Sequence, residues 1–125
     1  MTGSRWRFRL LWAVAVLLGG CGGGPSTSRA YNHLVAAAEA LKAGDKEKAH
    51  TELSASIDSS PNPWAYFERA RLNLDMGKED AAVADCQEGL KLDPTYRDLL
   101  WLSGELKKPA AKRFKGKLAK PPGQK

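Results

Sequence analysis

The chain has 125 residues, of which 42% are hydrophobic and 27% are charged, and this size and composition favour a single small globular domain. Its formal net charge of +6 is unevenly distributed: residues 1–28 carry +3, residues 29–106 carry −5, and residues 107–125 carry +8. Because the central segment is acidic, the high pI of the whole chain does not indicate a nucleic-acid-binding protein.

The first 20 residues have the order of a secretory signal peptide. Three arginines, Arg5, Arg7 and Arg9, precede an apolar run at residues 10–18. This run is too short to span a bilayer, which needs about 20 apolar residues. We therefore predict that residues 1–20 are a signal peptide, and an uncleaved membrane segment is the alternative.

The sequence LGGC that ends at Cys21 resembles the lipobox of bacterial lipoproteins. The resemblance implies that the Cys21 thiol receives a diacylglycerol, that the chain is cut before Cys21, and that the amine freed by the cut receives a further acyl chain, such as palmitate. Several acyl chains make a stable membrane anchor. In that family an aspartate directly after the cysteine favours retention in the inner membrane, and here the residue is Gly22. The resemblance therefore implies that the protein is anchored in the outer membrane, facing the periplasm, or in the cell membrane where there is no outer membrane. A signal peptide without lipidation is the alternative. The glycine-rich residues 21–28 predict a flexible tether.

Residues 29–108 contain an internal repeat with helical patterning. Three pairs of residues recur at a spacing of 33: Gly44 and Gly77, Ala49 and Ala82, and Pro61 and Pro94. Apolar residues within each unit recur at helical intervals, which predicts amphipathic helices. Asp45 and Asn62 are suitable N-caps, and the two glycines are suitable helix ends. The pattern predicts two helical hairpins.

The second unit, residues 63–94, resembles the tetratricopeptide repeat (TPR) family. Tyr66 takes the position of the early aromatic residue, Ala70 and Ala82 take the small positions where the helices cross, and Pro94 takes that of the terminal proline. The first unit, residues 30–61, matches more weakly.

Three residues depart from the family pattern: Arg69, Asn73 and Gly89 stand where a leucine, an aromatic residue and an alanine are usual. The resemblance implies an all-α fold, a short TPR-like α-solenoid of two helix pairs with a capping helix at residues 95–108 and disordered termini. Residues 109–125 have no acidic residue and three prolines, which predicts a basic, disordered tail.

In the TPR family the first helix of each pair lines a concave groove that binds a protein or peptide. The candidate groove residues, by position, are Tyr31, Leu34, Leu41, Trp64, Phe67, Arg71 and Leu74. Aromatic residues and arginine are typical of binding hot spots, although packing between helices is the alternative for each residue. A groove this apolar favours an extended or helical peptide.

The sequence has no motif for catalysis or for a cofactor. It contains no phosphate-binding loop and no nucleophile motif, and its two histidines have no cysteine or acid at metal-ligand spacing. We expect Asp80 and Asp85 on a solvated helix face and Cys86 packed in the core. The chain is therefore predicted to be no enzyme and to have no metal, cofactor or small-molecule substrate.

These features predict a protein-binding scaffold or adaptor lipoprotein that assists the assembly of an envelope complex. The alternative is a structural tether, in which the basic tail binds an acidic envelope polymer or lipid surface and the helical domain self-associates as a homo-oligomer. Self-association is considered because two repeats plus one helix are fewer than the roughly three units that usually make a repeat array stable.

Overall fold

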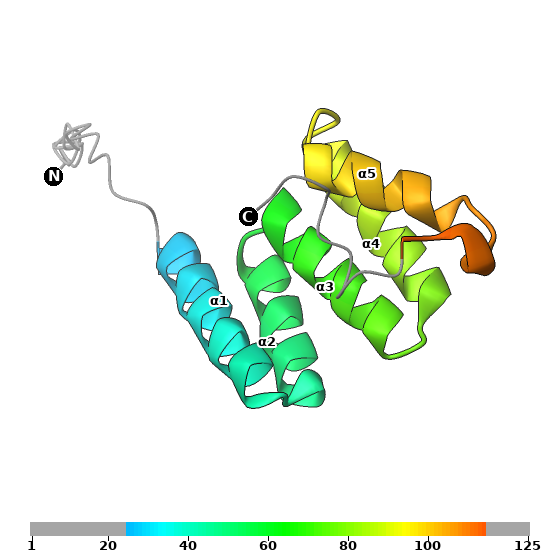
Figure 1. The fold of residues 1–125 in the computed structure, drawn as a ribbon. Helices are drawn as coiled ribbons and strands as arrows, with labels where there is room; N and C mark the ends of the chain where they lie inside the picture. Colours follow the sequence, from blue (N-terminus) through cyan, green and yellow to red (C-terminus); the bar gives the residue numbers. More distant parts are fainter. Residues whose placement is uncertain (1–24, 115–125) are drawn as a thin grey trace, which may run out of the picture.

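The computed structural model describes residues 25–114, and the predicted signal peptide, Cys21 and residues 115–125 lie outside this range. Six elements follow one another along the chain: α1 (Pro25–Ala43), α2 (Lys46–Ser59), α3 (Pro63–Asp75), α4 (Glu79–Leu92), α5 (Arg97–Leu106) and a short 3-10 turn, η1 (Ala110–Lys112). Within the described range every regular element is helical, so the predicted all-α fold class is confirmed (Figure 1).

Local sequence signals mark four of the ten ends of the described α-helices: the starts of α2 and α3 and the ends of α1 and α3. The Asp45 side chain caps α2 by accepting a hydrogen bond from the backbone N–H of Lys48 at 3.0 Å. The Asn62 side chain caps α3 in the same way, from the N–H of Ala65 at 2.8 Å. Gly44 and Gly77 each have φ of +75°, the left-handed conformation that follows the end of α1 and of α3.

Helix α1 begins earlier than expected. Residues 25–28 were assigned to the flexible tether, whereas they form the first turn of α1, so the predicted tether is too long at this end. Pro25 is the first helical residue, a position where the fixed φ of proline is already helical and its missing N–H costs nothing.

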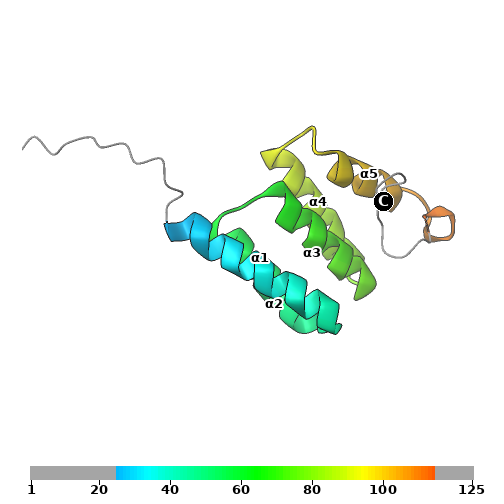
Figure 2. The same ribbon diagram turned by 60° about the vertical axis from the view of Figure 1, so that its left-hand side comes forward.

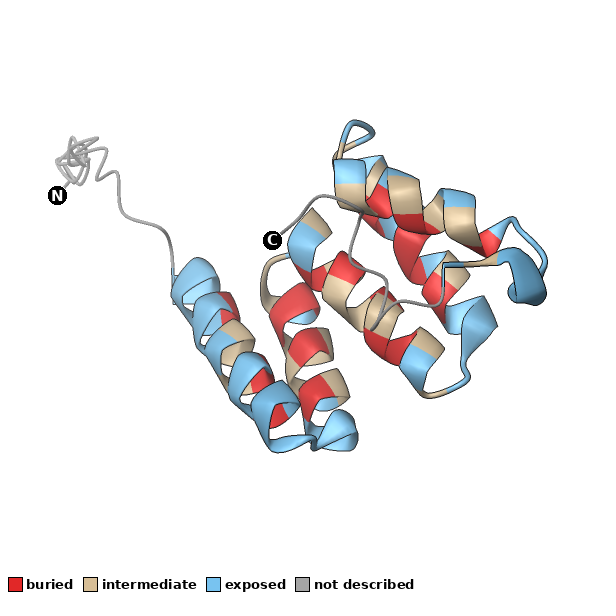
Figure 3. Ribbon diagram, viewed as in Figure 1, coloured by how far each residue is buried: buried red, intermediate tan, exposed pale blue. Residues whose placement is uncertain are grey.

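Successive helices run in alternating directions and pack mainly against their neighbours in the sequence (Figures 1 and 2). One buried cluster joins α1, α2 and α3, and consists of Ala37, Ala40, Ala49, Leu53 and Leu72. A second joins α3, α4 and α5, and consists of Phe67, Ala70, Ala82, Cys86, Leu99, Leu102 and Leu106. Several helix contacts are made by alanines, which let the backbones approach closely. The buried residues accordingly face the neighbouring helices (Figure 3).

A polar network crosses the interior between these clusters. Arg69 donates from Nε and Nη2 to the carboxylate of Asp85, with a shortest distance of 2.6 Å, and from Nη1 to Ser54 Oγ at 3.0 Å. Asn73 donates from Nδ2 to the same carboxylate at 2.9 Å. Asp85 is only 4% exposed, so our expectation that it lies on a solvated face is wrong. Asp80, by contrast, is exposed.

Residues 109–114 fold back onto the helices, whereas we predicted a disordered tail from residue 109. Arg113 pairs with both carboxylate oxygens of Glu79 at 2.8 Å and donates to the carbonyl of Leu106 at 3.0 Å. The Phe114 ring meets Trp101 edge-on, with centroids 6.1 Å apart. The tail prediction for residues 115–125 falls outside the described residues.

Candidate functional site

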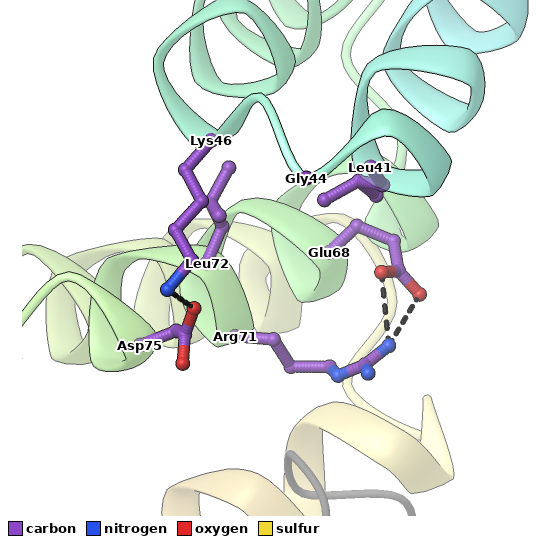
Figure 4. A pocket seen from close by; sticks show the side chains of 7 residues that line it. All are labelled: Leu41, Gly44, Lys46, Glu68, Arg71, Leu72 and Asp75. Carbon is purple, nitrogen blue, oxygen red and sulfur yellow. Dashed lines mark hydrogen bonds and ion pairs between the residues drawn. The ribbon is translucent and has the colours of Figure 1, made fainter.

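A pocket lies where the end of α1 and the start of α2 meet the side of α3 (Figure 4). Its volume is about 280 Å³. We call it the α1–α3 pocket; it is lined by Leu41, Gly44, Lys46, Glu68, Arg71, Leu72 and Asp75.

The geometry of the pocket follows from helix periodicity and from one turn. Its four α3 residues lie at positions 68, 71, 72 and 75, a spacing that places their side chains along one face of a helix. The left-handed turn at Gly44 ends α1 beside this face and brings Lys46, the first residue of α2, across to it. Leu41 and Leu72 supply apolar surface; Leu72 is buried, whereas Leu41 is 39% exposed.

Two ion pairs flank this apolar surface. Arg71 donates from Nη1 to both carboxylate oxygens of Glu68 at 2.9 Å, and Lys46 Nζ pairs with the carboxylate of Asp75 (Figure 4). The two acids balance the two bases, so the lining carries no net charge. The pocket is therefore suited to an apolar side chain whose neighbours are polar or charged, and its lining contains no hydroxyl, thiol or imidazole group for nucleophilic or base catalysis.

Arg71 is held in place before any partner binds. Its guanidinium lies over the ring of Phe67, 5.5 Å from the centroid, and its side chain is 16% exposed. The Arg71 Nε–H is buried without an acceptor among the residues that the structure describes. A preorganised side chain loses little conformational entropy on binding.

The structure brings two of the predicted groove residues, Leu41 and Arg71, into this pocket. Phe67 differs from the expectation: it is 4% exposed and belongs to the core, where it supports Arg71 instead of meeting a partner. Leu34 and Leu74 are partly buried and pack against the two core clusters.

Trp64 and Tyr31 lie outside the pocket. Trp64 is 40% exposed at the start of α3, and Tyr31 is 66% exposed on α1 beside a separate, shallow depression. Trp64 is one helical turn before Glu68, on the side of α3 that lines the pocket.

Sequence reasoning missed five of the residues that line the pocket: Gly44, Lys46, Glu68, Leu72 and Asp75. Three of these lie on α3 at helical spacing from Arg71, so the periodicity contained the signal for them. Gly44 and Lys46 arrive through the turn between α1 and α2, and no local pattern indicates which part of α3 that turn will face.

Other chemistry is not evident in the described part of the chain. Between residues 25 and 114, no group of three His, Cys, Asp or Glu residues is placed to hold a metal ion. No helix in this range is long and apolar enough to cross a membrane. Cys86 is buried, which raises the pKa of its thiol to about 12, so it is a poor nucleophile.

Comparison with known proteins gave no match: no family model, no curated protein and no solved structure matches this chain. The TPR resemblance and the lipid anchor therefore remain predictions from the sequence.

Proposed function

We propose that this protein is a non-enzymatic binding scaffold, held at a bacterial envelope membrane by lipid on Cys21, whose α1–α3 pocket binds a segment of a protein partner. The observation that carries the proposal is the pocket itself, an apolar surface between the Glu68–Arg71 and Lys46–Asp75 ion pairs.

The size of the pocket favours a peptide side chain over a cofactor. Its volume of about 280 Å³ lies just below the range of roughly 300–1,000 Å³ that is usual for small-molecule sites. Full burial of one apolar side chain contributes about 1.5–3 kcal/mol. Such a contact is too weak alone, so further contacts outside the pocket are needed for a stable complex.

Trp64 is well placed to make these further contacts. It lies one turn before Glu68 on the same side of α3 as the pocket residues and is 40% exposed. Tryptophan and arginine are the residue types most enriched in binding hot spots. A partner segment that fills the pocket beside Arg71 and continues along α3 reaches Trp64.

Site-specific photo-crosslinking tests this proposal in the full chain. A photoreactive amino acid at position 41, in the pocket, should give an adduct with a defined partner, and Trp64→Ala should abolish that adduct. Position 92, which is 48% exposed on α4, is the matched control. Identical adducts from positions 41 and 92, or an adduct unaffected by Trp64→Ala, would refute binding at the pocket.

The anchor and the tether alternative have separate tests. Palmitate should label the wild-type chain and not Cys21→Ala, and an unlabelled wild type refutes the lipid anchor. Deletion of residues 115–125 should spare partner binding in a scaffold and abolish function in a tail-based tether. The deletion begins at residue 115 because residues 109–114 pack against α4 and α5.

A further inference from the structure

Helix α1 has an exposed face that no other described element covers. Tyr31, Val35, Ala38 and Lys42 recur at intervals of four, three and four residues, so they form one stripe along the helix, here called the outer face of α1. All four are exposed, and Tyr31, at 66%, is the most exposed of the large hydrophobic residues in the described range. The helix lies at one end of the row and packs chiefly on α2 (Figure 2).

Helix α1 also differs in charge from the other four α-helices. Among the five α-helices of residues 25–114 it is the only one with a net positive charge, from Arg29 and Lys42 against a single acid, Glu39. Helix α4, for comparison, carries four acids and one base. Of these charges, Lys42 is the one on the outer face, because Arg29 lies two residues before Tyr31 on the other side of the helix, and the exposed Glu39 lies beside the stripe. Lys42 is therefore the group that would draw this face to an anionic surface.

The position of α1 in the chain restricts what can meet this face. Pro25 opens the helix four residues after Cys21, and a chain of that length spans at most about 14 Å. If Cys21 is lipid-anchored, the first turn of α1 must therefore stay close to the membrane surface.

We infer that the outer face of α1 lies on the anionic bilayer to which Cys21 is anchored, with Tyr31 and Val35 in the headgroup layer and Lys42 beside lipid phosphates. This inference rests on the lipid anchor of the proposed function. Tyrosine, with an apolar ring and a polar hydroxyl, and lysine, with an apolar stem and a charged end, both suit this layer. A 19-residue helix is about 28 Å long, so contact along the whole face also accounts for the exposed Val35 and Lys42 far from the anchored end.

The arrangement would orient the binding site. Leu41 and Gly44, at the C-terminal end of α1, line the α1–α3 pocket, so a helix lying on the membrane holds the pocket near the bilayer surface. The partner segment would then be a membrane-proximal part of a protein in the same membrane.

A fluorescent label at position 35 tests the inference in the full, acylated chain. Val35→Cys is labelled and reconstituted into vesicles of phosphatidylethanolamine and phosphatidylglycerol, and Leu92→Cys on α4 is the matched control. The buried Cys86, with its raised pKa, does not compete for the label. The label at position 35 should be protected from aqueous iodide and quenched by lipid-bound nitroxide, and the label at position 92 should behave in the opposite way.

A charge variant tests the electrostatic part. Lys42→Gln should lower the equilibrium constant for lipid contact of α1 about five-fold, whereas Lys91→Gln, its match on α4, should leave it unchanged. Equal effects of the two substitutions would refute a specific role of Lys42 at the lipid surface.

The remaining outcomes separate the inference from the proposed anchor. A label at position 35 that stays open to iodide while Cys21 carries palmitate overturns the inference and leaves the anchor intact. Absence of palmitate on Cys21 overturns both. Protection that rises with protein concentration, without quenching by lipid-bound nitroxide, assigns the outer face to a second copy of the chain and also overturns the inference.

Discussion

Asp85→Ala is expected to lower the free energy of unfolding by about 3 kcal/mol. The Asp85 carboxylate accepts hydrogen bonds from Arg69 and from Asn73. Its removal leaves a largely buried guanidinium that keeps, among the described residues, the hydrogen bond to Ser54 and the contact with the Tyr66 ring, 5.6 Å from its centroid. Breaking a buried ion pair from one side costs about 3–5 kcal/mol. Arg69 is 21% exposed and can turn partly toward water, which favours the lower end of that range.

This loss is large for a domain of this size. The 90 described residues predict a total stability of about 5–13 kcal/mol at the usual 0.05–0.15 kcal/mol per residue. A loss of about 3 kcal/mol should lower Tm by about 12–24 °C. Urea unfolding followed by circular dichroism measures the change, with Asp80→Ala on the exposed face of the same helix as the matched control, expected to cost under about 1 kcal/mol.

A triple replacement tests the physical cause. Arg69→Leu, Asn73→Leu and Asp85→Ala together remove every buried charge of the network, and with it the cost of desolvating those charges. The triple variant should therefore recover to within about 1 kcal/mol of the wild type. A loss for Asp85→Ala no greater than for Asp80→Ala would refute the burial of the pair, and a triple variant as unstable as Asp85→Ala would refute the desolvation argument.

Three further predictions concern the packing of α4 and its neighbours. Gly89→Ala should destabilise the protein by about 1–2 kcal/mol in urea unfolding, because a Cβ there would lie 2.4 Å from Leu99 Cδ1 in a filled core, and overpacking outweighs the gain of about 1 kcal/mol in helix propensity. A stabilised variant would show that Leu99 has room to move. The hydrogen bond from Arg113 lowers the pKa of Glu79 below its ordinary value of 4.5, so this contact stabilises the fold above about pH 4.5 and is lost as the pH falls through the lowered value. The side-chain carboxyl signal of Glu79, followed by NMR, should titrate at a lower pH in the wild type than in Arg113→Gln, and equal midpoints in the two proteins contradict the assignment. Cys86 should be alkylated far more slowly in the folded than in the urea-unfolded protein, because its pKa of about 12 against 9.0 lowers the thiolate fraction about a thousand-fold, and equal rates by mass spectrometry would contradict its burial.

The start of α2 and both ends of α3 were predictable because caps act between neighbouring residues. The Asn62 cap with Pro63 and the left-handed Gly77 mark the two ends of α3, and the structure has them there. Residues 109–114 could not be predicted in the same way. They are held by Arg113, whose partner Glu79 is 34 residues away on α4, and composition alone favoured disorder.

The Asp85 network shows where charge misled the sequence reasoning. Asp85 lies between Ala82 and Cys86 at helical spacing on the buried face of α4, but an acid at such a position is usually solvated. Its partners Arg69 and Asn73 also depart from the apolar pattern of α3. Three polar residues at inward positions are consistent with one shared hydrogen-bond network. The sequence alone does not show that these residues meet, because that depends on how α3 and α4 pack side by side.

The candidate site also has some features that are local to the sequence and others that depend on the packing of helices. The sequence by itself determined the helical fold and several helix ends, because capping bonds and periodicity are local properties of the chain. Leu41 and Arg71 were selected by their positions in the TPR-like pattern, together with five candidates that do not line the pocket. Only the tertiary structure decided that Phe67 supports Arg71 from the core and that Lys46 meets Asp75 across the pocket. Those contacts depend on how α1, α2 and α3 cross, and the crossing is set by the packing of side chains from all three helices.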